Sequence, residues 1–248
     1  MKNRFLIEKQ NINGDNIIIA GEEFCHLYKV LRLRVGDSIE CFFEGSDIFV
    51  CTLTQVANNL AVAKIVGTKK CEANPKISVT VFQALPKLDK LELITEKLVE
   101  LGVSEIVPFA STFTNAKPQA VRTDRLNKIV ISAAKQCGRT DLLKVNAPVR
   151  FKEVLEMLKN FKTVIFANET EEKQTLGEVF KKSHTPQAGV AIIIGSEGGF
   201  NKQEIDDLIK AGAKSVSLGK RILRTETAAI VMTALVMERI LELGVKGN

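Results

Sequence analysis

The pattern of hydrophobic positions changes near residue 70. Before that point, short runs rich in β-branched and aromatic residues are bounded by Gly, Asn and Asp, which is typical of strands joined by turns. These runs predict strands at residues 16–20, 38–45, 47–56 and 60–67. Residues 22–33 are the exception, because Phe24, Leu27 and Leu31 recur at helical spacing. We expect a small β-barrel-like module, since closing the sheet would protect its edges.

A polar linker at residues 69–76, which contains Pro75, separates this module from the rest of the chain. It predicts two domains, at residues 1–72 and 73–248. Beyond the linker, predicted strands lie at residues 77–85, 105–110, 163–169, 190–195 and 215–219, and predicted helices at 88–101, 122–137, 201–212 and 225–243. This alternation indicates an α/β domain whose mainly parallel sheet is covered on both faces.

Composition narrows the class of protein. With 45% hydrophobic residues, the 248-residue chain can build a packed core. No apolar run approaches the ~20 residues that a membrane helix needs, and the N-terminus is too polar for a secretory signal, so we expect a soluble cytoplasmic protein. Five cysteines without a Cys-x-x-Cys pair, and only two histidines, argue against a disulfide framework and a zinc site. We expect the thiol of Cys41 to pack in a core.

The net charge of +6 is concentrated in one stretch of the chain. Residues 115–144 carry seven basic and two acidic side chains, so 7 − 2 gives +5 for this stretch alone. Such a cluster is consistent with a polyanionic partner. It is equally consistent with a solvated helix face, and the charge by itself does not decide between the two.

Two glycine-bearing turns carry the strongest functional signal. The first glycine turn, IIIGSEGGF at residues 192–200, has neither the lysine of a P-loop nor a GxGxxG pattern. Gly198 and Gly199 permit a positive φ and a close approach of a ligand to the backbone. The carboxylate of Glu197 would repel a phosphate, so the turn suits a cationic or hydroxyl-rich ligand better. A tight turn followed by a helix cap is the alternative interpretation.

The second glycine turn is SLGKRILRTETAA, residues 217–229. Lys220, Arg221 and Arg224 stand just before a predicted helix, where both their charges and the free N–H groups favour an anionic group. Ile222 and Leu223 are too apolar for an ordinary exposed loop and could form the walls of a pocket for a flat heterocycle. Two strand–turn–helix units this close in sequence can place both turns at one edge of a sheet, where open α/β sheets bind ligands.

At these turns the chain resembles the SPOUT-class methyltransferases. More narrowly, it is similar to the ribosomal RNA small-subunit methyltransferase E family, which methylates N3 of a uridine in 16S ribosomal RNA. Further matches are HLYKVLRLRVGD (26–37), QALPKLDKLELITEKLVELGV (83–103) and AAKQCGRT (133–140). One departure is STFTN (111–115), where relatives commonly carry an arginine.

The resemblance implies a fold, a cofactor and partners. It implies a C-terminal SPOUT-type parallel-sheet methyltransferase domain with a trefoil knot, and a small N-terminal PUA-like β-barrel that binds RNA. The cofactor would be S-adenosylmethionine, the substrate the 16S ribosomal RNA of the small subunit, and the protein a homodimer without a metal. The apolar helix at residues 225–243 is compatible with a partner surface and equally with a buried core helix.

The resemblance also implies which residues form the site. The cofactor would lie between three loops, at residues 166–169, 194–199 and 217–228. Its expected contacts are Phe166, Ala167, Glu169, Ile194, Gly195, Gly198, Gly199, Ser217, Leu218, Gly219, Ile222, Leu223, Thr225, Thr227 and Ala228. Arg224, and after it Arg221, would stabilise the negative charge on the uracil, or would contact phosphate. Glu197 or Glu226 could accept the N3 proton, although the negative charge of Glu226 could instead stabilise the N-terminus of the following helix.

RNA contacts are expected in both predicted domains. The expected residues are Arg4, His26, Lys29, Arg32 and Arg34 in the small domain, and Lys87, Gln136 and Arg139 in the large one. His26 could instead be a partly buried histidine whose hydrogen bonds are satisfied within the fold. The basic stretch at residues 115–144 would follow the phosphate backbone.

Two rival functions remain. A ribose 2′-O-methyltransferase of the same class would usually carry an early Asn-x-x-x-x-Arg-like motif, which residues 77–87 lack. A non-catalytic ribosome-assembly factor would bind RNA through the barrel and the basic helix, but would not need the two glycine turns. A nucleoside-triphosphate enzyme is disfavoured because its phosphate-binding lysine is missing.

Overall fold

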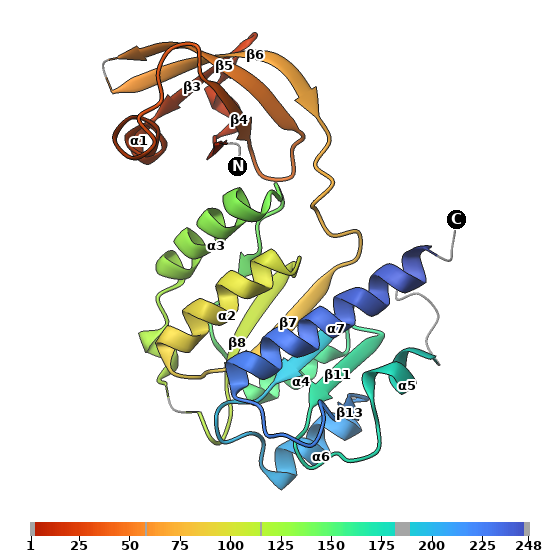
Figure 1. Cartoon of the computed structure of the whole chain (residues 1–248). Coiled ribbons are helices and arrows are strands. Elements are labelled where there is room, and N and C mark those ends of the chain that lie inside the picture. Colours follow the sequence, from red (N-terminus) through yellow and green to blue (C-terminus); the bar gives the residue numbers. More distant parts are fainter. Residues whose placement is uncertain (1–2, 58, 115, 182–188, 246–248) are drawn as a thin grey trace. The chain divides into compact units, whose positions relative to one another are not determined.

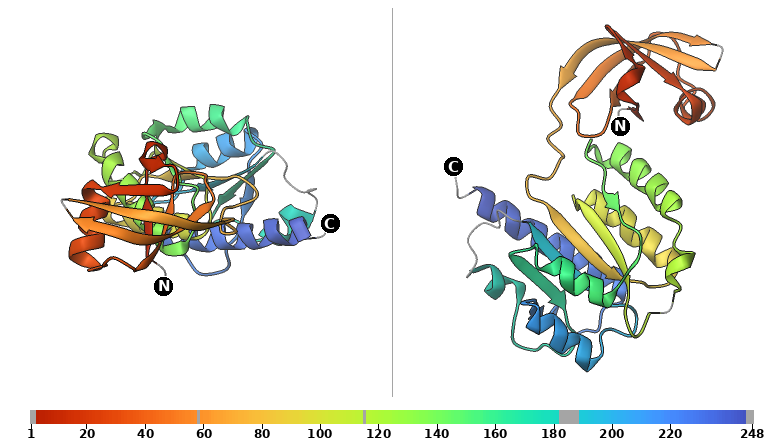
Figure 2. Two further views of the ribbon diagram at one scale, coloured as in Figure 1. Left: turned by 90° about the horizontal axis from the view of Figure 1, so that it is seen from above. Right: turned by 180° about the vertical axis from the view of Figure 1, so that it is seen from behind.

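A computed structural model of the chain describes residues 3–57, 59–114, 116–181 and 189–245 (Figures 1 and 2). The chain divides into two compact units. The first comprises Met1–Asn74 and Ala134–Leu142, and the second comprises Pro75–Ala133 and Leu143–Asn248. The last turn of the basic helix, together with the residues that follow it, is therefore assigned to the N-terminal unit.

The first unit is built on a curled six-stranded sheet in the order β1-β4-β5-β6-β3-β2. Its strands are β1 (Arg4–Leu6), β2 (Ile12–Asn13), β3 (Asn16–Ala20), β4 (Ser38–Phe42), β5 (Ile48–Ala57) and β6 (Leu60–Lys69), with a 3-10 turn, η1 (Lys9–Asn11). β1 pairs parallel with β4, and the other neighbours are antiparallel. The four predicted strands are confirmed. Among the described residues the sheet runs from β1 to β2 without joining them, so it is a half-barrel rather than a closed barrel.

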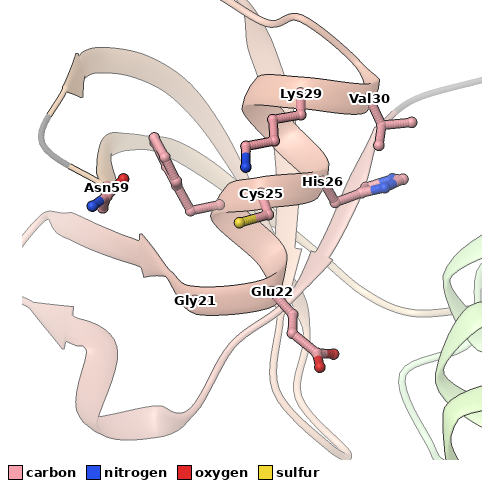
Figure 3. Close-up of a pocket in the computed structure, with 8 residues that line it drawn as sticks. Gly21, Glu22, Cys25, His26, Lys29, Val30 and Asn59 are labelled. Carbon is pink, nitrogen blue, oxygen red and sulfur yellow. The ribbon is translucent and has the colours of Figure 1, made fainter.

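The predicted helix after β3 is confirmed in an irregular form (Figure 3). It begins as α1 (Gly21–Cys25) and continues as a π-helical turn, η2 (His26–Val30). Phe24 and Leu27 are buried, as their helical spacing predicts. Arg32 follows with a φ of 54°, a left-handed conformation that ends the helical segment.

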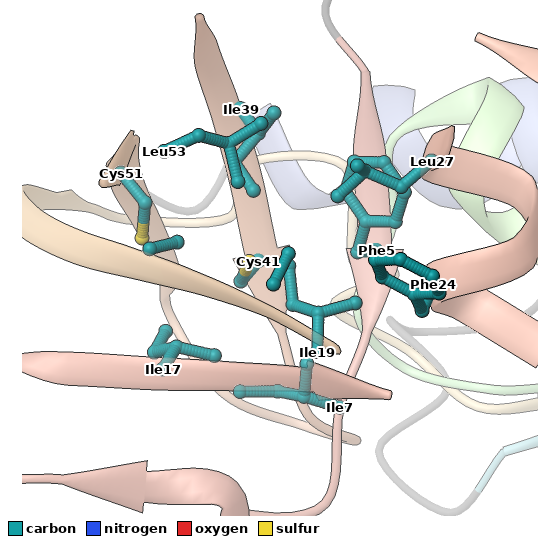
Figure 4. Packing of buried hydrophobic residues seen from close by; sticks show 12 residues of the cluster. Phe5, Ile7, Ile17, Ile19, Phe24, Leu27, Ile39, Cys41, Cys51 and Leu53 are labelled. Carbon is teal, nitrogen blue, oxygen red and sulfur yellow. The ribbon is translucent and has the colours of Figure 1, made fainter. Parts of the chain in front are cut away.

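The core of the first unit is formed by the inward side chains of the sheet and of this helix (Figure 4). Cys41 and Cys51 lie within it and are free thiols. The neighbouring Cys51 thiol and burial both raise the pKa of Cys41. Its thiol therefore stays neutral and packs as a small apolar group, which confirms the expectation for Cys41.

The second unit contains a seven-stranded parallel sheet in the order β10-β8-β7-β12-β11-β13, with β9 beside β8. The strands are β7 (Val79–Ala84), β8 (Glu105–Ala110), β9 (Lys144–Val145), β10 (Val149–Arg150), β11 (Thr163–Ala167), β12 (Val190–Ile194) and β13 (Lys214–Val216). The helices are α2 (Leu88–Glu100), η3 (Pro118–Ala120), α3 (Thr123–Cys137), α4 (Phe151–Leu158), α5 (Leu176–Lys181), α6 (Lys202–Lys210) and α7 (Thr225–Val245). The expected alternation is confirmed; the short elements β9, β10, α4 and α5 had no predicted counterpart.

Helices cover the parallel sheet on both faces, as its almost continuously apolar strands require. α4 and α6 pack on one face, where Val154 and Leu208 join Phe82 and Phe166 in the core. α2 and α7 lie side by side on the other face (Figure 1). Met232 and other residues of α7 are buried there, so one side of this helix belongs to the core.

Two absences hold for the described part of the chain. None of its helices is long and apolar enough to cross a membrane. It also contains no cluster of three or more His, Cys, Asp or Glu side chains that could hold a metal ion.

Candidate functional site

The three predicted ligand loops follow three neighbouring strands. β11 lies between β12 and β13 and is parallel to both. Their carboxyl ends therefore share one edge of the sheet, and the loops that follow them meet there. Three contacts join these loops. The Asn168 N–H donates to Val216 O at 3.1 Å, the Ser217 N–H donates to Gln174 O at 2.9 Å, and Thr225 Oγ1 donates to Gly195 O at 2.6 Å.

The first glycine turn leaves little room for a side chain at Gly195 or Gly198, and a positive φ restricts Gly199. A β-carbon on Gly195 would lie 3.1 Å from Gly199 Cα, and one on Gly198 would lie 2.7 Å from Phe113 Cβ. Gly199 has a φ of 67°, and a β-carbon there would lie 3.7 Å from the carboxylate of Glu169 in the loop after β11. The glycines thus allow backbone to approach backbone closely, and they bring an acidic group beside the turn.

The second glycine turn is polar at its tips and apolar between them. Arg221 and Arg224 are exposed, and no ion pair engages either guanidinium within the described residues. Ile222 between them is 82% exposed, the highest value for a large apolar side chain in the described chain. An exposed apolar side chain between two exposed cations is the arrangement that the sequence predicted for one wall of a cofactor pocket, although a single exposed apolar side chain is common on protein surfaces.

Beneath the two turns lies a buried polar network centred on Gln83, which the sequence analysis did not identify. Gln83 is the only amide among the fully buried residues of β7, and its Nε2 donates to Ala84 O, Gly195 O and Thr225 Oγ1 at 2.9, 3.3 and 3.0 Å. Thr225 begins α7 and in turn bonds Gly195. The network therefore ties the first glycine turn to the second through one side chain. A glutamine inside a mostly apolar strand was the signal in the sequence.

Lys90, in the first turn of α2, was also missed. Its Nζ lies 3.2 Å from Glu197 Oε1 and 3.3 Å from Glu226 Oε2. Glu197 Oε1 also accepts the backbone N–H of Lys87 at 3.2 Å. Partial burial by itself would raise the pKa of Glu197, but backbone N–H groups and Lys90 outweigh it, so the pKa of this carboxyl is lowered. A carboxylate held this way is a weak proton acceptor, which argues against Glu197 as the base.

The loop after β8 packs against the first glycine turn. The Thr112 N–H donates to Glu204 Oε1 at 2.8 Å, and Ser196 Oγ donates to Phe113 O at 2.8 Å. Glu204 and Asn201 form the capping box that begins α6. Residues 111–114 of the departing STFTN stretch are therefore fixed beside the turn; Asn115 lies outside the described residues.

Several residues expected to bind RNA belong to the first unit. His26 and Lys29 line a hollow of about 630 Å³ beside the tip of the β5–β6 hairpin (Figure 3). The hollow lies in the first unit, whereas the glycine turns belong to the second. His26 is half-buried and its ring meets Phe5 edge-on, while Arg32 and Arg34 are exposed.

Two of the expected RNA contacts are corrected by burial and pairing. Arg139 is only 2% exposed, so it cannot reach a phosphate from this position. Arg4 is mostly buried, and its Nε donates to Glu40 Oε2 at 2.8 Å. Both guanidinium groups serve the interior of the first unit. Gln136 and Lys87, by contrast, are exposed.

The basic stretch at residues 115–144 is partly neutralised by the fold. Arg125 pairs with Glu92 at 2.6 Å, Lys135 with Glu23 at 2.8 Å and Lys144 with Glu105 at 2.9 Å. With Arg139 buried, at least four of its seven basic side chains are thus already engaged within the described residues. The stretch offers less free charge to a polyanion than the sequence suggested.

Comparisons with known proteins point to RNA methyltransferases along most of the chain. Residues 72–237 match the family model of an RNA methyltransferase domain, and residues 19–66 match that of an RNA methyltransferase PUA domain. The ribosomal RNA small subunit methyltransferase E of Rickettsia conorii is 32% identical over 242 residues, which cover 96% of each chain. That of Bacillus subtilis is 30% identical over 237 residues, covering 92% of this chain and 93% of its own. The chain belongs to the ribosomal RNA small subunit methyltransferase E family.

Structural comparison agrees with this family assignment. The crystal structure of the Neisseria gonorrhoeae family member bound to S-adenosyl methionine has a TM-score of 0.85 and 28% identity to this chain, covering 96% of it and 98% of the other. The resemblance drawn from the two turns is confirmed, together with the methyltransferase class and the pairing of a PUA module with a parallel α/β domain. The individual site residues remain predictions.

Proposed function

We propose that this protein transfers the methyl group of S-adenosylmethionine to N3 of a uridine in the 16S RNA of the small ribosomal subunit. The observation that carries the proposal is the meeting of three loops at the carboxyl ends of β11, β12 and β13. Two of these loops are the glycine turns of a family whose members are named for small-subunit RNA methylation.

The residues present fit the cofactor. Gly195 and Gly199 let the backbone of the first glycine turn fold closely on itself at the shared edge of the sheet, and Ile222 supplies an exposed apolar surface for a heterocycle. Glu169, whose carboxylate lies near Gly199, adds negative charge suited to a cationic sulfonium compound. The remaining contacts would come from Phe166, Ala167, Ile194, Gly198, Ser217, Leu218, Gly219, Leu223, Thr225, Thr227 and Ala228.

When bound, the cofactor supplies an electrophilic methyl carbon on sulfur. The chain's own work is to position the uracil, and good alignment can contribute about 7–11 kcal/mol to catalysis. Loss of the N3 proton spreads negative charge onto O2 and O4 of the base. Arg224, exposed and one residue before α7, would stabilise that charge, with Arg221 as the second candidate. Glu197 and Glu226 are the two candidates for accepting the proton. Lys90 lies close to both, and Glu197 in addition accepts the backbone N–H of Lys87, which weakens it as a base.

RNA would be held mainly by exposed side chains of both units, together with the half-buried His26. His26, Lys29, Arg32 and Arg34 present cationic or polar side chains in the first unit, and Lys87 and Gln136 add to them. Phosphate contacts of this kind release counterions, so affinity should fall steeply with salt. We further infer that the C-terminal strands and turns form a trefoil knot, and that the protein works as a homodimer in the cytoplasm.

The proposal is tested with labelled S-adenosylmethionine and small ribosomal subunits that lack the modification. After incubation, the labelled nucleotide is mapped and its modified atom identified. Label on N3 of one uridine is the expected result. Label on a ribose 2′-oxygen would support the rival methyltransferase, and binding of the subunit without transfer would support an assembly factor; either result would overturn the proposal.

A further inference from the structure

The ammonium group of Lys90 stands between two carboxylates from different parts of the chain. Glu197 belongs to the first glycine turn and Glu226 to the second, at the start of α7. Their oxygens lie 3.2 and 3.3 Å from Lys90 Nζ. All three side chains are mostly shielded, with exposed fractions of 21%, 23% and 15%. Without the lysine, two like charges would face each other across the gap between the turns.

A second link between the same turns lies in the interior. Gln83 bonds both Gly195 and Thr225, and is fully buried. Gln83 is the second-last residue of β7 and Lys90 lies in the first turn of α2, so the eight residues from 83 to 90 carry both links. One link is neutral and buried, and the other is ionic and near the surface. The segment from β7 to α2 thus contacts both glycine turns twice, once in the interior through Gln83 and once near the surface through Lys90.

Lys97, in the same helix, forms ion pairs among the described residues only with neighbouring residues of that helix. Lys97 also pairs with two carboxylates, Glu96 and Glu100, at 2.7 and 2.8 Å. Both partners belong to α2 itself, so these pairs connect nothing beyond the helix. The two lysines therefore differ in what they join rather than in the number of their partners.

We propose that Lys90 is a positioning residue that holds the two glycine turns at the spacing at which the cofactor binds. It acts through Glu197 and Glu226 and does not touch the reacting atoms. The inference rests on the proposed function, since it assigns the space between the turns to S-adenosylmethionine.

The test compares Lys90→Met with the matched control Lys97→Met. Cofactor dissociation constants are measured by calorimetry, and hydrogen exchange of peptides covering residues 192–200 and 217–229 is measured without cofactor. For Lys90→Met we expect cofactor affinity to fall about three- to tenfold, the size that partly shielded ion pairs can supply. Both turns should exchange faster, since the opening that the ion pairs resist becomes easier. Lys97→Met should leave both measurements unchanged.

Steady-state kinetics and the conservative variant Lys90→Arg distinguish a positioning role of Lys90 from a general loss of stability. In Lys90→Met the KM for the cofactor should rise, and Lys90→Arg should restore it. Equal affinity and equal exchange in the Lys90→Met and Lys97→Met proteins would overturn the proposal, as would a loss of kcat at unchanged KM. If the unaltered protein binds no S-adenosylmethionine, the proposed function fails, whereas the exchange comparison still decides whether Lys90 joins the turns.

Discussion

Replacing Gly198 with alanine tests how closely the first glycine turn is packed. The added β-carbon would lie 2.7 Å from Phe113 Cβ and 3.1 Å from Phe113 Cγ. The first of these atoms is attached directly to the backbone, and the carbonyl of Phe113 accepts a 2.8 Å hydrogen bond from Ser196. A change of rotamer therefore cannot relieve the clash, and the loop after β8 must move. Overpacking of this kind costs about 1–3 kcal/mol.

Thermal unfolding measures this cost. For a chain of this length, each kcal/mol lowers Tm by about 2–4 °C, so a fall of about 2–12 °C is expected. The control is Gly177→Ala in the same unit, because a β-carbon there meets its nearest atom, Thr175 Oγ1, only at 3.8 Å. That variant should keep or slightly raise Tm, since alanine favours a helix.

A double variant identifies the contact responsible. Phe113→Gly removes the atom that the new methyl group would strike, so Gly198→Ala should have little further effect in that background. If Gly198→Ala lowers Tm equally in both backgrounds, the clash with Phe113 is not the cause and the reasoning is refuted.

Three further predictions concern the site and the first unit. Arg224→Ala should reduce kcat by about 10²–10³-fold while the cofactor dissociation constant is largely kept, as for a group that stabilises developing charge; unchanged turnover would remove Arg224 from the mechanism. Ile222→Ser should leave Tm nearly unchanged, because the side chain is exposed, and should weaken cofactor binding about tenfold if the cofactor covers it; equal affinity by calorimetry would show that it does not. Although burial alone would raise the pKa of Glu40, Lys69 and Arg4 lower it below its ordinary value of 4.5. Its contribution to stability is therefore present above that value and lost as the pH falls, so urea unfolding should show a smaller acid loss for Glu40→Gln than for the unaltered protein.

Local patterns in the sequence predicted most of the secondary structure. The run at residues 16–20 coincides with β3, and the apolar stretch at 225–243 lies within α7. Asn201 and Glu204 form the expected capping box because both partners lie within one helical turn. The short strands β1 and β2 escaped prediction, because three or two residues carry too little periodicity to recognise.

Local sequence patterns could not predict the contacts between segments that lie far apart along the chain. Arg139 and Arg4 looked like RNA-binding cations, since charge is visible in a sequence and burial is not. Lys90 looked like an ordinary helix surface residue, because its two partners lie more than a hundred residues away. Gln83 was hidden for the same reason, since Gly195 and Thr225 meet it only after the sheet forms.

The sequence by itself determined the alternation of strands and helices, the two glycine turns and, through them, the family. These features depend on neighbours within a few residues, where spacing and side-chain type decide the conformation. Only the tertiary structure decided that β11 lies between β12 and β13, which brings the three loops to one edge. It also decided which charges are free, because pairing and burial depend on atoms that the fold brings together from far along the chain.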